Sequence, residues 1–134
     1  MGEIQKISDI LRSMTFDFFG GGKHKITAEN FFKSKNTIFL DVRSSTEYET
    51  LSFNLVHHMP VLNIPTEEIP DRMNEIPKDK LVGIFCSSGT RASMVYLYLR
   101  MNGYENIRIL SGGYNLISEE LMPGKILKSI ESKK

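Results

Sequence analysis

The chain contains a single cysteine and no tryptophan among its 134 residues. One cysteine cannot form an internal disulfide, and no cluster of cysteine and histidine has the spacing of a zinc site. We therefore expect no disulfide framework and no metal, and we expect a protein of the reducing cytoplasm. No apolar run approaches the roughly 18 residues that cross a bilayer, so no membrane association is expected either.

The chain also lacks an excess of charge of either sign. The 17 lysines and arginines nearly balance the 16 aspartates and glutamates, which leaves a net charge of +1. A nearly neutral chain argues against binding to nucleic acid and against a strongly acidic partner. Hydrophobic residues make up 40% of the sequence, which is enough for the core of one compact domain.

The beginning of the chain is predicted to form a helical arm. Apolar residues recur there at helical spacings of three and four: Ile4, Ile7, Leu11 and Met14. The predicted helix ends before Phe16, and the glycines at residues 20–22 follow as a flexible hinge. We expect residues 1–22 to be this arm and hinge, and residues 23–134 to be the main domain. The apolar face of the arm packs either on its own domain or on a partner, such as a second copy of the chain in a homodimer.

Beyond the hinge, short apolar runs alternate with helical stretches. Strands are predicted at Ile26 and at residues 37–40, 61–64, 81–85 and 107–110. Helices are predicted at residues 28–35 (with Thr27 as the N-cap), 45–50, 66–73, 91–102, 114–122 and 125–130. This alternation indicates an α/β fold whose sheet is covered by helices on both faces. The helix at residues 91–102 is apolar on almost every face, so we expect it to be buried.

The most informative segment is a buried strand that leads into a loop of small residues and then into a helix. The loop and its borders are Cys86, Ser87, Ser88, Gly89, Thr90 and Arg91. Ligands of open α/β sheets bind beyond the carboxyl ends of strands, where Cys86 would lie. Inward-pointing backbone N–H groups, the N-terminus of the helix and the Arg91 charge all favour a thiolate. Cys86 is therefore expected to be a nucleophile, although a lone cysteine after an apolar strand can also be a small core residue.

Four motifs in order resemble the rhodanese family. They are Phe39-Leu40-Asp41-Val42-Arg43 followed by Glu47-Tyr48, residues 57–65 (HHMPVLNIP), Cys86-Ser87-Ser88-Gly89-Thr90-Arg91 in the pattern C-x-x-G-x-R, and Leu110-Ser111-Gly112-Gly113-Tyr114. The resemblance covers about residues 25–121. It implies a three-layer α/β fold with a central, mostly parallel five-stranded sheet and helices on both faces.

The same resemblance implies a sulfurtransferase that carries sulfane sulfur as a persulfide on Cys86. The donor would be thiosulfate or another persulfide, and the acceptor would be cyanide or a protein thiol. No metal or organic cofactor is required. The backbone N–H groups of Ser87, Ser88, Gly89, Thr90 and Arg91 would stabilise the negative sulfur.

The charged residues around the predicted site allow alternatives. Arg91 either orients an anionic donor or pairs with Asp41 or Glu47 and braces the loop. Arg43 is either a cation that faces the substrate or a surface charge. His57 is expected to be a structural loop residue rather than an acid or base, because sulfur transfer from a thiolate needs little proton movement.

Two other functions remain open on the same fold. One is a phosphatase or arsenate reductase. Cell-cycle phosphatases of this fold use a C-x5-R loop, whereas Cys86 and Arg91 form a C-x4-R loop, which suits one sulfur atom better than a phosphate. A non-enzymatic interaction module usually lacks the cysteine, but the apolar arm favours such a role. The sulfur chemistry itself is not expected to need residues 1–22.

Overall fold

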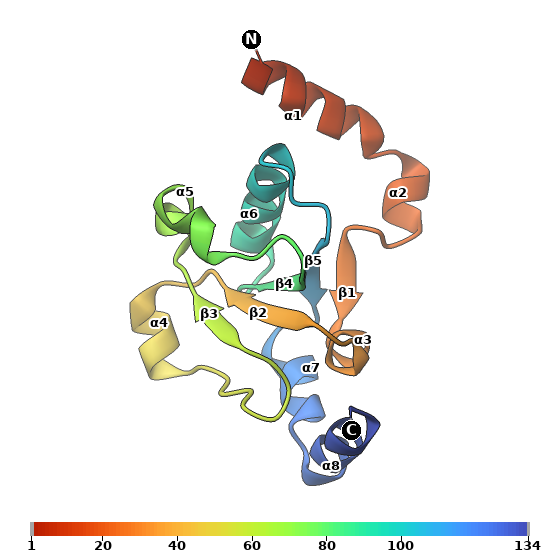
Figure 1. The fold of residues 1–134 in the computed structure, drawn as a ribbon, viewed down its shortest axis with the longest axis vertical. Coiled ribbons are helices and arrows are strands. Elements are labelled where there is room, and N and C mark those ends of the chain that lie inside the picture. Colours follow the sequence, from red (N-terminus) through yellow and green to blue (C-terminus); the bar gives the residue numbers. More distant parts are fainter. Residues whose placement is uncertain (1, 134) are drawn as a thin grey trace.

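The computed structural model describes residues 2–133. Its five strands form one sheet in the order β1-β5-β4-β2-β3 (Figure 1). The strands are β1 (Lys25–Thr27), β2 (Thr37–Asp41), β3 (Val61–Asn63), β4 (Leu81–Phe85) and β5 (Ile107–Ser111). All neighbouring strands are parallel. The expected five-stranded α/β sheet is confirmed, and it is wholly rather than mostly parallel.

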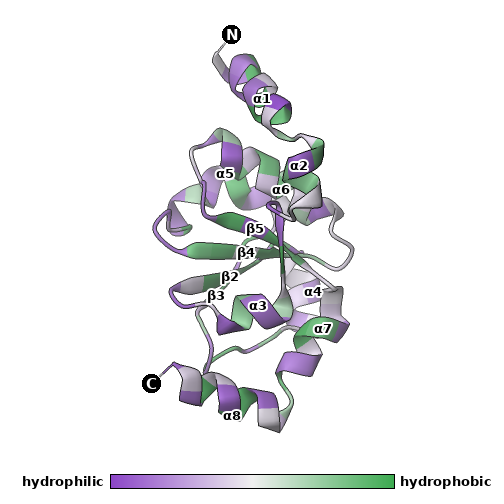
Figure 2. Ribbon diagram, turned by 90° about the vertical axis from the view of Figure 1, so that its right-hand side faces the viewer, coloured by the Kyte–Doolittle hydropathy of each residue, from purple (hydrophilic) through white to green (hydrophobic). Residues whose placement is uncertain are grey.

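Eight α-helices surround the sheet in the described part of the chain. They are α1 (Gly2–Ser13), α2 (Phe16–Gly20), α3 (Ala28–Lys33), α4 (Ser45–Thr50), α5 (Ile69–Arg72), α6 (Thr90–Met101), α7 (Gly113–Glu120) and α8 (Pro123–Ser132). Figure 2 shows α1, α2, α5 and α6 on one side of the sheet, and α3, α7 and α8 on the other. The predicted three layers are therefore present.

Alternating side chains of the central strands supply two hydrophobic cores, one on each face. Ile38 and Leu40 of β2 point into the core beneath α5 and α6, whereas Phe39 points into the core beneath α3 and α7. Because both faces are covered, all five residues of β2 are buried. Gly83 of β4 is needed for this packing, since a Cβ there would lie 2.7 Å from the ring of Phe31.

Short-range signals set several helix boundaries as predicted. The Thr27 hydroxyl accepts a hydrogen bond from Asn30 N at 3.2 Å, which caps the start of α3. The left-handed conformation of Gly103, at φ +86°, follows the end of α6. The predicted helix at residues 66–73 is instead broken into a 3₁₀ turn (Thr66–Glu68), the short α5 and a second 3₁₀ turn (Met73–Glu75).

The helix predicted at residues 91–102, which is α6, was expected to be buried, and this expectation is wrong for one of its sides. Met94 and Tyr98 of α6 are 62% and 36% exposed. A helix that lies on one face of a sheet buries one side only, and Val95, Tyr96 and Leu99 occupy that side. Within residues 2–133, no helix is both long enough and apolar enough to cross a membrane.

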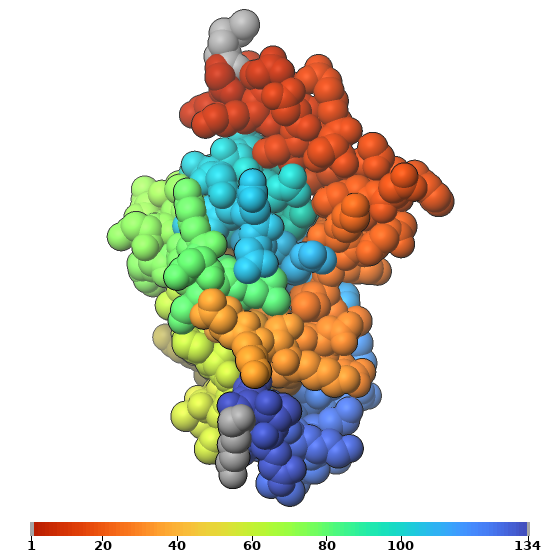
Figure 3. All heavy atoms as spheres, turned by 45° about the vertical axis from the view of Figure 1, so that its right-hand side comes forward, coloured from red at the N-terminus to blue at the C-terminus, as the bar shows by residue number. Residues whose placement is uncertain are grey.

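The N-terminal arm lies at one end of the molecule, against α6 (Figure 3). It contains a second helix, α2, which starts at an N-cap formed by Thr15. Met14 and Phe18 pack against the core beneath α6, which shows that the arm docks on its own domain. Several apolar side chains remain exposed: Ile4, Leu11, Phe16 and Phe19. A second copy of the chain on this face, and the boundary of the domain at residue 23, stay predictions.

Candidate active site

Cys86 lies directly after β4, at the carboxyl end of the sheet, and is 4% exposed. Two backbone N–H groups donate hydrogen bonds to its sulfur, one from Gly89 at 3.0 Å and one from Ala92 at 3.3 Å. The left-handed backbone of Gly89, at φ +91°, turns the loop back toward the sulfur at the N-terminus of α6. Hydrogen bonds of this kind, together with the helix dipole, stabilise a negatively charged sulfur more than a neutral thiol.

The Arg91 side chain forms no hydrogen bond with the sulfur and braces the loop, where it also donates to the Ser87 hydroxyl at 3.2 Å. Its two terminal nitrogens donate to the two carboxylate oxygens of Glu47 at 2.7 and 3.0 Å. Glu47 is itself fixed, because it forms a capping box with Ser44 at the start of α4. Hydrogen bonds from Arg91 and Ser44 lower the pKa of Glu47 from 4.5 to about 2. Of the partners proposed for Arg91, the structure selects Glu47 rather than Asp41.

Arg43 is buried, so both expectations for it, a substrate-facing cation and a surface charge, are wrong. Its side chain is 1% exposed and forms an ion pair with Asp41 at 2.7 Å. Its guanidinium also donates to Leu51 O at 2.8 Å and to the Tyr114 hydroxyl at 2.9 Å. The Phe85 ring lies beneath it, 5.2 Å away. Arg43 therefore joins the end of β2 to the end of α4 and to α7.

The sulfur of Cys86 opens onto a pocket of about 490 Å³. Four of the predicted loop residues line it: Ser87, Ser88, Gly89 and Thr90. The remaining walls come from Ser93 of α6, residues 109–113 around the end of β5, and His24 with Lys25 at the start of β1. This volume lies within the range of small-molecule sites, roughly 300–1,000 Å³.

The family can now be assigned. The family model "Rhodanese-like domain" matches residues 26–120, which is most of the chain. This chain belongs to the rhodanese-like domain family.

Known proteins similar to this rhodanese-like chain include sulfurtransferases. A tRNA sulfurtransferase of Mannheimia succiniciproducens is 29% identical over 60% of this chain and 16% of its own length. A sulfurtransferase of Allochromatium vinosum is 46% identical over 39% of this chain and 49% of its own length. The crystal structure of a rhodanese-related protein from Thermoplasma volcanium covers 75% of this chain and 95% of its own, with a TM-score of 0.62 and 27% identity. The chain thus spans less than half the length of these two sulfurtransferases.

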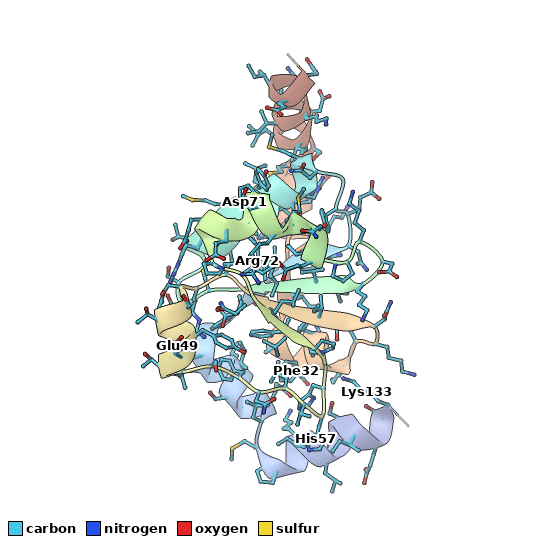
Figure 4. The ribbon with its side chains drawn as sticks, turned by 60° about the vertical axis from the view of Figure 1, so that its left-hand side comes forward. Phe32, Glu49, His57, Asp71, Arg72 and Lys133 are labelled. Carbon is cyan, nitrogen blue, oxygen red and sulfur yellow. The ribbon has the colours of Figure 1, made fainter. Side chains whose placement is uncertain are left out.

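Sequence reasoning missed His24 and Lys25 among the residues that line the rhodanese-like pocket. His24 and Lys25 precede the motifs, and only the parallel pairing of β1 with β5 brings them beside the cysteine loop. His57, in contrast, is exposed on the loop that enters the edge strand β3 at its amino end, beside α8 (Figure 4), whereas Cys86 follows the carboxyl end of the central strand β4. This position rules out His57 as an acid or base at Cys86.

Proposed function

We propose that this rhodanese-like domain is a sulfurtransferase that carries sulfane sulfur as a persulfide on Cys86. The observation that carries the proposal is the pair of N–H groups, from Gly89 and Ala92, that donate to the sulfur of a cysteine in the lining of a pocket of small-molecule size. Membership of the family and the sulfurtransferases among its relatives support the same activity. A cytoplasmic setting belongs to the proposal, because a reducing compartment keeps a lone thiol free.

The first half-reaction transfers sulfur from the donor to the enzyme. The Cys86 thiolate attacks the outer sulfur of thiosulfate, the sulfur–sulfur bond of thiosulfate breaks, and sulfite leaves with the bonding electrons. The negative charge then resides on the outer sulfur of the Cys86 persulfide. Since attacker, product and leaving group are all anions, no proton moves and no oxidant is needed. The N–H donors of the loop stabilise the anionic sulfur throughout.

The second half-reaction returns the enzyme to its starting state. An acceptor nucleophile, either cyanide or the thiolate of another protein, attacks the outer sulfur of the persulfide. The bond between the two sulfur atoms breaks, and the Cys86 thiolate leaves. Thiocyanate or a new protein persulfide is the product, and the kinetics should be ping-pong.

Intact-mass measurement tests this proposal directly. Because Cys86 is the only cysteine, incubation with thiosulfate should add one sulfur atom per chain, and cyanide should remove it with formation of thiocyanate. Cys86→Ser should keep the fold and lose both signals, since a hydroxyl cannot hold a persulfide. Absence of any sulfur adduct with thiosulfate and with a persulfide donor would favour the alternative, a non-enzymatic interaction module. The exposed Leu11, Phe16 and Phe19 of the arm are the observation that supports that alternative.

A further inference from the structure

The Cys86 pocket needs a positive charge if its sulfur donor is an anion, and neither arginine of the motifs supplies one. Arg91 is held by the Glu47 carboxylate, and its side chain does not line the pocket. Arg43 is enclosed by Asp41 and two aromatic rings. The backbone N–H groups of Gly89 and Ala92 donate to the sulfur itself. The far end of an anionic donor therefore calls for a second positive group in the pocket wall.

Among the described residues that line this pocket, Lys25 is the only lysine or arginine. It is the first residue of β1, opposite Ile109 of β5, and its side chain is exposed. No acidic side chain within residues 2–133 forms an ion pair with it. Its charge is therefore available to a ligand.

The surroundings of Lys25 are positive rather than acidic. Burial lowers the pKa of the neighbouring His24, and the charges of Lys25 and Arg108 lower it further. His24 is thus neutral near pH 7, and the positive charge of this wall resides on the lysine and on Arg108 behind it. The Arg108 guanidinium lies 3.5 Å from the carbonyl oxygen of Lys25.

The N-terminal arm holds this wall in position. The rings of Phe18 and Phe19 lie 5.9 and 5.0 Å from the His24 ring. The carbonyl oxygen of His24 accepts a hydrogen bond from Ile109 N at 2.9 Å, which ties the segment to β5. Lys25 directly follows His24, so the packing of the His24 ring and the hydrogen bond to β5 also hold the backbone of Lys25 in place.

We propose that Lys25 binds the anionic end of the sulfur donor while the sulfane sulfur faces Cys86. This inference rests on the proposed function and narrows its substrate class to small donors with a sulfonate-like end, such as thiosulfate. A neutral donor gains nothing from the lysine charge, whereas an anion is attracted into the pocket and oriented with its sulfane sulfur toward the thiolate.

Replacement of the lysine charge tests the proposal through steady-state kinetics. Lys25→Met should raise the KM for thiosulfate about tenfold, with kcat changed less than about twofold, because the lost interaction is made equally in the ground state and transition state. Lys25→Arg should restore the KM. Lys23→Met is the matched control, because Lys23 is exposed and close in sequence but does not line the pocket.

A second measurement does not depend on sulfur transfer. The rate of Cys86 alkylation by anionic iodoacetate, divided by the rate with neutral iodoacetamide, reports the charge of the pocket. Lys25→Met should lower this ratio about fivefold, and Lys23→Met should leave it unchanged. One outcome separates the two proposals: neither the wild type nor any variant transfers sulfur, but Lys25→Met still lowers the alkylation ratio. The proposed function would then be wrong, whereas the recognition of anions by Lys25 would stand. A ratio and a KM that both stay at wild-type values in Lys25→Met overturn the proposal.

Discussion

Arg91 and Glu47 form a bidentate ion pair between residues 44 positions apart in the chain, with N–O distances of 2.7 and 3.0 Å. The pair joins the first turn of α6 to α4 at the carboxyl end of the sheet. It holds the far end of the cysteine loop, because Arg91 directly follows Thr90. The side chains are 33% and 37% exposed, so the pair is a surface brace rather than a buried one.

Glu47→Gln should make the free energy of unfolding depend less on pH in the acid range. The pKa of Glu47 is about 2 in the folded chain, against an ordinary 4.5. A lowered carboxyl pKa contributes stability that is complete above about 4.5 and is lost as the pH falls through about 2. The stability difference between wild type and Glu47→Gln should therefore shrink from pH 5 to pH 2 in urea melts.

Glu49→Gln provides the control for this measurement. Glu49 lies on the same helix (Figure 4), and it forms no ion pair within residues 2–133. Its replacement should leave the acid limb of the stability profile unchanged. An equal effect of both substitutions would mean that general surface charge, and not the pair with Arg91, determines the profile.

Gly89→Ala should slow the reaction of Cys86 with iodoacetamide and destabilise the fold by about 1–2 kcal/mol, the cost of a left-handed backbone for a residue with a Cβ. The space itself is open, since no heavy atom lies within 4 Å of the added Cβ. Gly124→Ala is the matched control, with equally open space and an ordinary helical backbone. In thermal melts, Gly124→Ala should leave the melting temperature unchanged or raise it. An equal loss of stability in both variants would show that the left-handed backbone of Gly89 is not the cause.

Arg43→Met should cost about 3–5 kcal/mol of stability, because it leaves the buried Asp41 carboxylate without its partner. Arg12→Met removes the arginine of another Arg–Asp pair, whose side chains are 71% and 62% exposed. An exposed pair contributes at most about 1 kcal/mol, so this control should barely change the midpoint in urea. Similar midpoints for the two variants would show that the Asp41 site is hydrated in solution.

Insertion of one small residue between Thr90 and Arg91 should weaken sulfur transfer and create measurable phosphate binding. The present loop closes on a single atom, with Gly89 N and Ala92 N both directed at Sγ. A C-x5-R loop would be wide enough for an oxyanion instead. Calorimetry with phosphate and a cyanide assay check this prediction, and unchanged results in both would show that loop length does not discriminate the two chemistries.

A chain that starts at Lys23 should keep its cyanide-dependent turnover and lose stability, as the apolar arm predicts. The structure adds that His24 loses its contacts with Phe18 and Phe19, so the KM for thiosulfate should also rise. A chain that starts at Met14 removes α1 alone and should keep the wild-type KM. Thermal melts, light scattering and kinetics compare the truncated chains with the full chain. An equal melting temperature, oligomeric state and KM for all three chains would make the arm dispensable.

Much of the fold could be predicted from the sequence, because its signals are local. The five strands follow from short apolar runs, and the boundary at Thr27 follows from a hydroxyl that reaches a backbone N–H three residues away. The cysteine loop was located in the same way, since the strand, the small residues and the helix that form it are consecutive. Periodicity and capping depend on neighbours within a few positions, so they can be read without the tertiary structure.

Only the tertiary structure decided which charges meet and which face the pocket. It paired Arg91 with Glu47, buried Arg43 against Asp41, and brought Lys25 beside the loop through the pairing of β1 with β5. The Arg91–Glu47 pair, the contact of Arg43 with Tyr114 and the position of Lys25 depend on strand order and on the packing of segments that lie far apart in the chain. The spacing of residues in the sequence does not determine these contacts. From the sequence alone, each arginine could pair with more than one carboxylate or point to solvent, and only the packing of the sheet and helices selects one arrangement.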